Sequence, residues 1–344
     1  MSERVSHIED IPDEYFKPFR SNEKYSSEEM QVESVNFYQD SWRRLKKNKG
    51  AVASFVLLLI ILFVSIGSIW LTPHDPNAQE VRHSFLPPKI PGIHINGLNG
   101  YAKQGAEWVD VYKQKQVPSE VYYFLGTDKF GRDLLSRLLF GTRVSLLIAL
   151  FAAFLDLTIG VAYGLISGWL GGRVDTIMQR ILDIISGVPT LVVVVLMLLV
   201  FPPGIVSIAV AMALVGWTTM ARVVRGQTLQ LKNQEFVLAM KVLGQSPIKI
   251  ALGHILPNLS SIIIIQTMFT IPSAIFFEAF LSFIGVGMRV PDASLGTLIN
   301  EGYQTFRFYP HLMWYPALII SLIMIAFNIF ADGLRDAFDP KMKG

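Results

Sequence analysis

The sequence of 344 residues predicts an all-α membrane protein with six transmembrane helices. Hydrophobic residues make up 51% of the chain and charged residues only 17%, which is more apolar than a soluble domain of this length needs. A hydrocarbon core requires about 20 mostly apolar residues in a helix. The segments that meet this requirement are residues 51–71, 144–168, 181–201, 204–222, 259–284 and 312–332.

Residues 1–50 are predicted to form a cytoplasmic N-terminal tail. Charged residues, Ser and Pro are mixed there with little periodicity, which is typical of a disordered segment, and a short helix is expected before Trp42. The first transmembrane helix, residues 51–71, begins about fifty residues into the chain. It is therefore expected to be a retained anchor and not a cleaved signal peptide.

Basic residues next to the predicted spans cluster on alternate sides of the membrane. The short segment 201–204 joins the third and fourth spans, so these two are expected to be antiparallel neighbours. By the positive-inside rule, both termini and the segment 235–258 lie in the cytoplasm. The basic residues that determine this orientation are Arg43, Arg44, Lys46, Lys47, Lys49, Arg173, Arg180, Arg222, Arg225, Lys232, Lys241 and Lys249.

Residues 72–143 are predicted to form an extracellular loop region that includes an interfacial helix. The part up to residue 123 contains many Pro and Gly residues, and a long loop with turns and a small pair of strands is expected there. The spacing of His74, His83 and His94 fits neither one helix face nor a compact chelate. These histidines are expected to be exposed loop residues, and no metal site is predicted.

The predicted interfacial helix is marked by Asp128 and by four basic residues. Asp128 is a candidate cap for this helix. The helix either closes the outer mouth of a pathway, or meets a substrate-delivery protein, or is held by lipid headgroups and internal ion pairs alone. We assign it structural support. The basic residues are Lys129, Arg132, Arg137 and Arg143.

The segment EFVLAMKVLGQSPIKIALGHILPN, residues 235–258, is compatible with water although it lies between two apolar spans. Gly244 stands where a left-handed cap would end a first helix, and Ser246 and Pro247 suit the start of a second. Pro257 is expected to interrupt that second helix. Such an element in a membrane protein predicts docking of a soluble partner. The residues that recur at helical spacing are Phe236, Ala239, Met240 and Leu243, then Ile248, Ala251, Leu252 and Ile255.

This segment resembles the cytoplasmic signature of the membrane-spanning permease subunits of ATP-binding-cassette (ABC) importers. That signature is a Glu-Ala-Ala loop followed by Gly and then by Ile-x-Leu-Pro. Met240 takes the second Ala position, and Glu235 stands three residues ahead of the strict Glu position, which is Leu238. The resemblance implies that the segment couples to an ATPase. The matching residues are Glu235, Ala239, Met240, Gly244, Ile255, Leu256 and Pro257.

Two further segments, residues 124–146 and 276–299, are similar to the peptide and nickel branch of that family, as is DGLRDAFDP at 332–340. Several spaced motifs thus agree in order, and the resemblance covers most of residues 124–340. It implies the type I importer permease fold. Within the branch, the motifs look most like the second permease of an oligopeptide uptake system.

Asp156, Asp183 and Glu278 lie inside predicted spans, where an ionised side chain is costly. Asp156 lies near the centre of the second span, Asp183 near the cytoplasmic end of the third, and Glu278 near the outer end of the fifth, six residues after Pro272. Asp156 and Glu278 are the candidates for a pathway or gate. The alternatives are satisfied structural pairs for both aspartates and a cap or a hydrogen bond with Asn328 for Glu278.

Several classes of function lack their sequence signatures. The chain has no Cys, which excludes disulfides and thiol catalysis. It has no Gly-x-x-x-x-Gly-Lys-Ser/Thr loop, so ATP hydrolysis and cofactors are not expected on this chain. An ion-coupled carrier would show repeated spans and several mid-membrane acids, and an intramembrane enzyme would show convergent catalytic residues. Neither pattern is recognisable, and the net charge of +3 does not indicate nucleic-acid binding.

We therefore predict that this chain is the permease subunit of an ATP-driven peptide importer and forms half of the translocation pathway. No catalytic residue is expected. The alternatives are a dipeptide or a nickel permease of the same family. The resemblance implies a second homologous permease chain, two ATP-binding subunits and an extracellular peptide-binding protein, in the cell membrane of a prokaryote. The predicted divisions are an N-terminal tail at 1–50, a first transmembrane helix at 51–71, an extracellular region at 72–143, a core permease domain at 144–334 and a cytoplasmic C-terminal tail at 335–344.

Overall fold

The computed structural model describes residues 37–72, 74–202, 204–288 and 292–339. The predictions for residues 1–36 and for the end of the C-terminal tail lie outside this part. Residues up to Asp40 form a unit of their own, and the fold below is that of the unit that begins at Ser41. Helix α1 (Phe37–Lys47) confirms the short helix expected near Trp42, although it continues past that residue.

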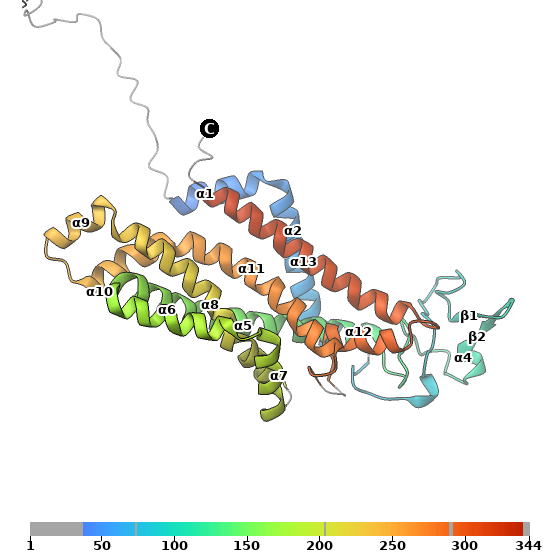
Figure 1. Ribbon diagram of the computed structural model, residues 1–344. Coiled ribbons are helices and arrows are strands. Elements are labelled where there is room, and N and C mark those ends of the chain that lie inside the picture. Colours follow the sequence, from blue (N-terminus) through green and yellow to red (C-terminus); the bar gives the residue numbers. More distant parts are fainter. Residues whose placement is uncertain (1–36, 73, 203, 289–291, 340–344) are drawn as a thin grey trace, which may run out of the picture. The chain divides into compact units, whose positions relative to one another are not determined.

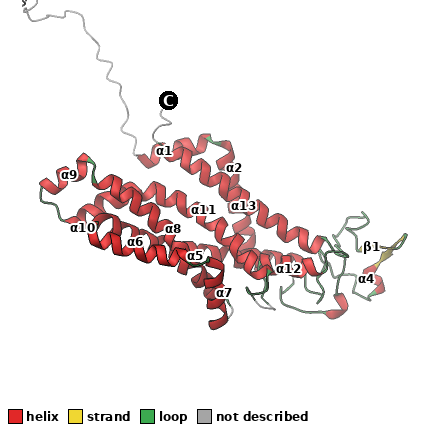
Figure 2. Ribbon diagram, in the orientation of Figure 1, coloured by secondary structure: helices red, strands yellow, loops and turns green. Residues whose placement is uncertain are grey.

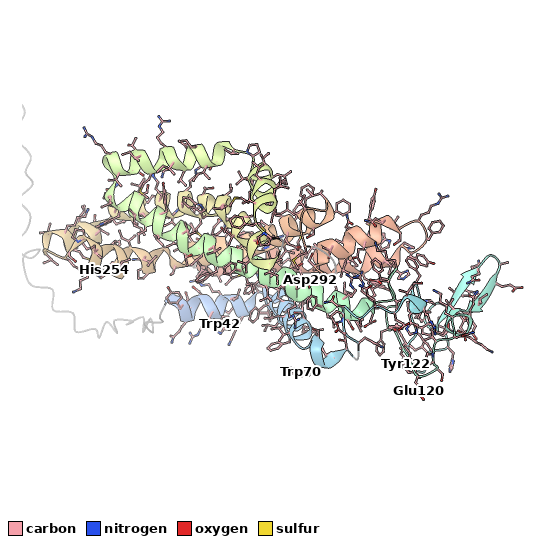
Figure 3. All side chains as sticks on the ribbon, turned by 90° about the horizontal axis from the view of Figure 1, so that it is seen from below. Trp42, Trp70, Glu120, Tyr122, His254 and Asp292 are labelled. Atoms are coloured by element: carbon pink, nitrogen blue, oxygen red, sulfur yellow. The ribbon has the colours of Figure 1, made fainter. Side chains whose placement is uncertain are left out.

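The first membrane helix, α2 (Lys49–Ile66), begins at the N-cap Asn48, whose side chain accepts a hydrogen bond from the backbone of Ala51. It ends at Gly67, and a short helix α3 (Ser68–Leu71) follows. The predicted span 51–71 is therefore divided in two. Trp42 and Trp70, both exposed, lie at the two ends of this segment (Figure 3), as expected for aromatic residues at membrane interfaces.

The region between α3 and the second membrane helix contains a small folded unit. Strands β1 (Tyr101–Gln104) and β2 (Glu107–Asp110) pair antiparallel, which confirms the expected pair of strands. A short helix α4 (Val111–Gln114) and a 3₁₀ turn at Val81–His83 complete it. Its apolar core consists of Leu86, Val111, Tyr112, Val117 and Tyr123. We call the end of the bundle that carries this unit the hairpin end (Figure 1).

Helix α5 (Leu134–Leu170) packs closely against α8 (Ile205–Lys232) along a stripe of glycines. A Cβ atom added at Gly160, Gly164 or Gly168 would overlap atoms of α8. Small residues at four-residue spacing let two membrane helices approach each other in this way. The stripe, absent from our sequence predictions, was visible as a repeat of Gly at every fourth position.

The predicted third span, 181–201, is a bent pair of helices. Helices α6 (Gly172–Gly187) and α7 (Thr190–Val200) meet at an angle of 79°. Val188 is extended and Pro189 lacks a backbone donor, so the helix cannot continue through them. In the described residues, five helices are long and apolar enough to cross a membrane, or six if the bent pair counts as one span.

The last part of the chain that the structure describes consists of α11 (Leu256–Phe283), α12 (Leu295–Gln304) and α13 (His311–Phe338). Helix α12 begins with a capping box between Ser294 and Thr297. Helix α13 continues into the predicted C-terminal tail and packs its Gly333 against Ala51 of α2. Figure 2 shows a mostly helical protein with strands only at the hairpin end, and the main apolar core lies among α5, α8, α11, α12 and α13.

Candidate functional site

The segment between α8 and α11 folds as the two short helices expected, at the end opposite the hairpin (Figure 1). Helix α9 spans Glu235–Val242, and Gly244 follows it with a φ of +76°. The backbone N–H of Gly244 donates to Lys241 and that of Gln245 to Met240, at 3.0 and 3.1 Å. This is the Schellman arrangement, which requires a left-handed residue after the helix. Nothing lies within 4 Å of an added Cβ, so the backbone alone favours glycine here.

The second helix, α10 (Pro247–Ile250), begins at Ser246 with Pro247 in its first turn, as expected. The prediction that Pro257 interrupts it is wrong. A π-helical turn, Ala251–Ile255, joins α10 directly to α11. The backbone N–H of Leu256 bonds to the carbonyl of Ala251, five residues earlier, so the wider turn carries the chain through the position where Pro257 supplies no donor.

The buried face of this segment differs from the predicted apolar face. Val237 is fully buried and Met240 packs beside it, against a cluster that includes Ile255 and Leu259. Phe236 and Ala239 face outward instead, because the helix rotates so that Val237 and Met240, three residues apart, meet the bundle.

Large apolar side chains remain exposed on these two helices, on the turn between them and on the π-helical turn that follows. Val242, Leu243 and Ile248 are 87%, 83% and 72% exposed, and Leu238 and Leu252 are about half exposed. Several exposed large apolar side chains in one short segment of a folded protein are typical of a binding surface. We call these five residues the α9–α10 patch. Of the other signature residues, Glu235 and Pro257 are exposed, Ile255 is buried and Leu256 is half-buried.

Polar contacts join α9, next to the α9–α10 patch, to the ends of the long helices. The ammonium groups of Lys241 and Lys232 lie 5.3 and 5.7 Å from the ring centroid of Trp169, at the end of α5. Near the same end, the Arg225 guanidinium on α8 donates two hydrogen bonds of 2.6 Å to Asp175 on α6. These contacts connect α9 with α5, and α8 with α6.

Asp156 lies on α5 beside a cavity of about 400 Å³. It is only 6% exposed, and its Oδ1 has no hydrogen-bond partner among the described residues. It therefore borders a cavity, whereas Asp183 is exposed and forms an ion pair of 3.4 Å with Arg222. The structural pair considered as the alternative for Asp183 is therefore present, with Arg222 as its partner.

Glu278 on α11 is fully buried and lies in a cluster of hydroxyl groups. Ser145 of α5 and Ser282 of α11 each donate a hydrogen bond of 2.8 Å to its carboxylate. The Ser145 hydroxyl accepts in turn from the backbone of Leu295, at the start of α12. Asn328, the partner considered above, is exposed. Glu278 therefore links three helices, and it does not line the cavity that contains Asp156.

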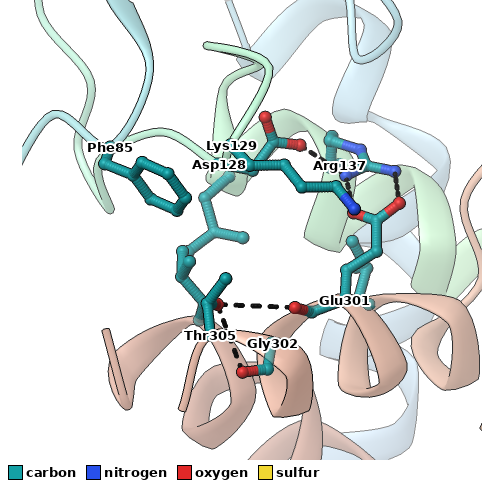
Figure 4. Close-up of a pocket in the computed structure, with 10 residues that line it drawn as sticks. Phe85, Asp128, Lys129, Arg137, Glu301, Gly302 and Thr305 are labelled. Atoms are coloured by element: carbon teal, nitrogen blue, oxygen red, sulfur yellow. Dashed lines mark hydrogen bonds and ion pairs between the residues drawn. The ribbon is translucent and has the colours of Figure 1, made fainter. Parts of the chain in front are cut away.

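A buried ion-pair cluster at the hairpin end replaces the predicted interfacial helix (Figure 4). Asp128 does not cap a helix; Asp133 caps α5 instead. Asp128 accepts hydrogen bonds of 2.6 Å from Arg132 and Arg137, and both guanidinium groups also contact Glu301 of α12. Both arginines are fully buried. The internal ion pairs considered as an alternative are thus present, at the start of one continuous helix, α5.

Metal ligation receives no support in the part of the chain that the structure describes. No group of three or more His, Asp or Glu side chains there could hold a metal ion. The expected exposure holds for His94 alone, because His74 and His83 are half-buried against Tyr123. His83 shares a hydrogen bond of 2.7 Å with the Tyr123 hydroxyl, and His74 stacks on the same ring.

Two family descriptions match this sequence. Residues 160–344 match the binding-protein-dependent transport system inner membrane component. Residues 36–88 match the N-terminal transmembrane domain of oligopeptide transport permease C.

Curated relatives match along nearly the whole chain. The dipeptide transport system permease protein DppC of Lactococcus lactis subsp. cremoris is 48% identical, covering 92% of this chain and 94% of the relative. The oligopeptide transport system permease protein OppC of Bacillus subtilis is 37% identical, covering 98% of this chain and 100% of the relative.

A solved structure of the MetNI methionine ABC transporter, in an inward-facing conformation, shares the fold. Its matching chain has a TM-score of 0.50 at 16% identity, covering 59% of this chain and 97% of that one. Permeases of this kind work with ATPase and substrate-binding partners and do not themselves hydrolyse ATP. The chain is therefore a multi-pass membrane protein that belongs to the family of binding-protein-dependent transport system inner membrane components, the permease subunits of ABC importers.

Proposed function

We propose that this chain is the permease subunit of an ATP-driven peptide importer and forms half of its translocation pathway. The names of its relatives, which are dipeptide and oligopeptide permeases, favour peptides over the nickel alternative. The α9–α10 patch carries the coupling role, because its apolar side chains leave water only if a second protein covers them. The partner that fits is the ATPase.

The complete importer contains a second homologous permease chain, two ATP-binding subunits and an extracellular peptide-binding protein. One copy of this bundle supplies one side of a pathway, and a homologous chain supplies the other. The helix ends around Trp169 and Arg225 transmit movement of the α9–α10 patch to α5, α6 and α8, since polar contacts join all of them.

Both termini and the α9–α10 patch lie in the cytoplasm in this proposal. Helix α13 begins beside α12 at the hairpin end, where Gly302 packs against Leu312 and Met313. It ends near the start of the first membrane helix, where Arg44 donates a hydrogen bond to the carbonyl of Asp339. The basic residues that precede α2 favour the cytoplasmic side. The hairpin unit is then extracellular, in a cell membrane of a prokaryote, where the peptide-binding protein delivers substrate.

The test is ATP-dependent uptake of labelled peptides by the reconstituted importer, together with recovery of its ATPase. Replacing Val242 and Leu243 by Asp should remove the ATPase from the purified complex and abolish uptake. Ile95→Asp, at a residue of the hairpin region that is 63% exposed, is the matched control for docking and should leave ATPase recovery unchanged. Normal ATPase recovery in the double variant would refute the docking role. The purified chain alone should show no ATP turnover.

A further inference from the structure

The cavity beside Asp156 is a polar hollow that opens on the surface of a largely apolar bundle, with the buried Asp156 in its wall. It lies among α5, the α6–α7 pair, α8 and α11, and its volume of about 400 Å³ falls within the range of small-molecule sites, roughly 300–1,000 Å³. Hydroxyl groups from four helices reach its wall. The polar residues that line it include Asp156, Ser186, Thr190, Thr219, Thr270 and Ser273.

The carboxylate of Asp156 is held at this wall without a counter-ion among the residues that the structure describes. A Cβ atom added at Gly216 of α8 would stand 2.6 Å from Oδ2 and 2.9 Å from Oδ1, so the missing side chain makes the space that the carboxylate occupies. Arg222 borders the same cavity, but its guanidinium contacts Asp183. It also lies six residues beyond Gly216, about 9 Å farther along a helix.

A buried carboxylate with an unpaired oxygen is costly unless a cation or a hydrogen-bond donor joins it. A primary ammonium group supplies both, because it carries one positive charge and three donors. The carboxylate and the neighbouring Thr and Ser hydroxyls can accept those donors together. Every unmodified linear peptide that does not begin with proline has one such group at its N-terminus, and a lysine side chain carries the same group.

We propose that this cavity is a subsite of the translocation pathway that receives the primary ammonium group of a peptide, with Asp156 as its counter-ion. The proposal rests on the proposed function, since it names the part of the substrate that this permease recognises. It also explains why glycine stands at position 216, since any side chain there would occupy the space of the Asp156 carboxylate between α5 and α8. Glu278 has no such role, because hydroxyl groups of its own chain already donate to it.

The experiment compares uptake of trialanine and N-acetyl-trialanine by the reconstituted importer, with each peptide at a concentration that saturates the binding protein. Asp156→Asn should lower the preference for the free ammonium group about tenfold or more. Asp156→Glu should restore part of it. Asp183→Asn, which removes a carboxylate that already has a partner, is the matched control and should keep the wild-type preference. An unchanged preference in Asp156→Asn would overturn the proposal.

Membrane abundance and ATPase activity separate this result from a folding defect. If Asp156→Asn does not assemble, Gly216→Ala makes the same comparison, because it keeps the charge and displaces the carboxylate. A retained preference in that variant would equally overturn the proposal. N-acetyl-Ala-Lys-Ala, whose one ammonium group is on the lysine side chain, tests which ammonium group the subsite accepts. Uptake like that of trialanine would mean that it accepts any primary ammonium group. Poor uptake would mean that it accepts the N-terminal one. Absence of all peptide uptake by the wild-type importer would instead refute the proposed function.

Discussion

Ser145 and Glu278, which are 133 positions apart in the sequence, form a hydrogen bond of 2.8 Å that joins α5 to α11 inside the bundle. The same hydroxyl accepts from the first residue of α12. Three helices thus meet at one carboxylate. Because Glu278 is sealed from the cavity, its influence on transport must pass through the packing of these helices.

A double-mutant cycle of Ser145→Ala and Glu278→Gln should give a coupling energy of about 0.5–1.5 kcal/mol, the range for hydrogen bonds between membrane helices. The free energy of unfolding in mixed micelles, followed by tryptophan fluorescence, measures this coupling energy. Additive single effects would show that the two residues do not interact.

If Glu278 also acts in a gate, Glu278→Gln alone should reduce peptide uptake while membrane abundance stays near normal. Unchanged uptake would remove Glu278 from any gate.

Gly244→Val should uncouple the importer without preventing membrane insertion. The position has a φ of +76° and open space around it, so the cost is that of forcing a β-branched residue into left-handed backbone, about 1–2 kcal/mol. Uptake and abundance are measured together. Gly244→Asn is the control, because Asn tolerates this conformation, and it should transport nearly as well as wild type. Equal uptake by the Val and Asn variants would exclude a backbone role.

Gly164→Ala should destabilise the pair formed by α5 and α8. The added methyl group would overlap the backbone of Ala221 and the side chain of Val224, and overpacking of this kind costs about 1–3 kcal/mol. Gly226→Ala on α8 is the matched control, since nothing lies within 4 Å of its added Cβ. Thermal unfolding of the purified chain distinguishes the two, and equal melting temperatures would contradict the close contact described here.

Glu301→Ala should be among the most destabilising changes at the hairpin end. It leaves the buried guanidinium groups of Arg132 and Arg137 with Asp128 alone, and breaking a buried ion pair costs about 3–5 kcal/mol. Asp183→Asn breaks an exposed pair and should cost about 0–1 kcal/mol. Unfolding in mixed micelles tests both, and similar small losses would mean that the buried cluster contributes little.

Single cysteines test the orientation without interference, because the chain has none of its own. Ser246→Cys, in the turn before α10, and Ala106→Cys, at the tip of the hairpin, are both exposed positions. An impermeant thiol reagent should label intact cells at residue 106 and not at residue 246. Labelling of residue 246 from outside would reverse the orientation and remove the α9–α10 patch from the side where ATP is available.

The apolar spans and the local turn chemistry could be predicted from the sequence because each depends on neighbouring residues. Gly244 and Pro247 illustrate this, since cap and helix start follow from their own backbone preferences. Local sequence does not predict that the helical chain bends at Pro189 but continues through Pro257. Both residues lack a donor, yet one ends a helix and the other stands after a π-helical turn, and the surrounding packing decides between these outcomes.

The partners of the membrane acids depended on tertiary structure and were predicted less well. Asp156 was identified from its place in the second span, but its cavity is assembled from four other segments of the chain. Glu278 was given the wrong partner because Ser145 is far away in sequence. The spacing of Gly160, Gly164 and Gly168 is a local signal in the sequence that marks where α8 packs.

The π-helical turn at Ala251–Ile255 has an evolutionary consequence. A π turn holds one residue more than the α-helical turn it replaces. A chain one residue shorter here would place Pro257 inside a regular α-helix, where its ring meets the carbonyl four residues earlier. The length of the ATPase-facing segment and the start of the membrane helix α11 are therefore tied together at this turn, so a change of length is tolerated better in the loop around Gly244 than here.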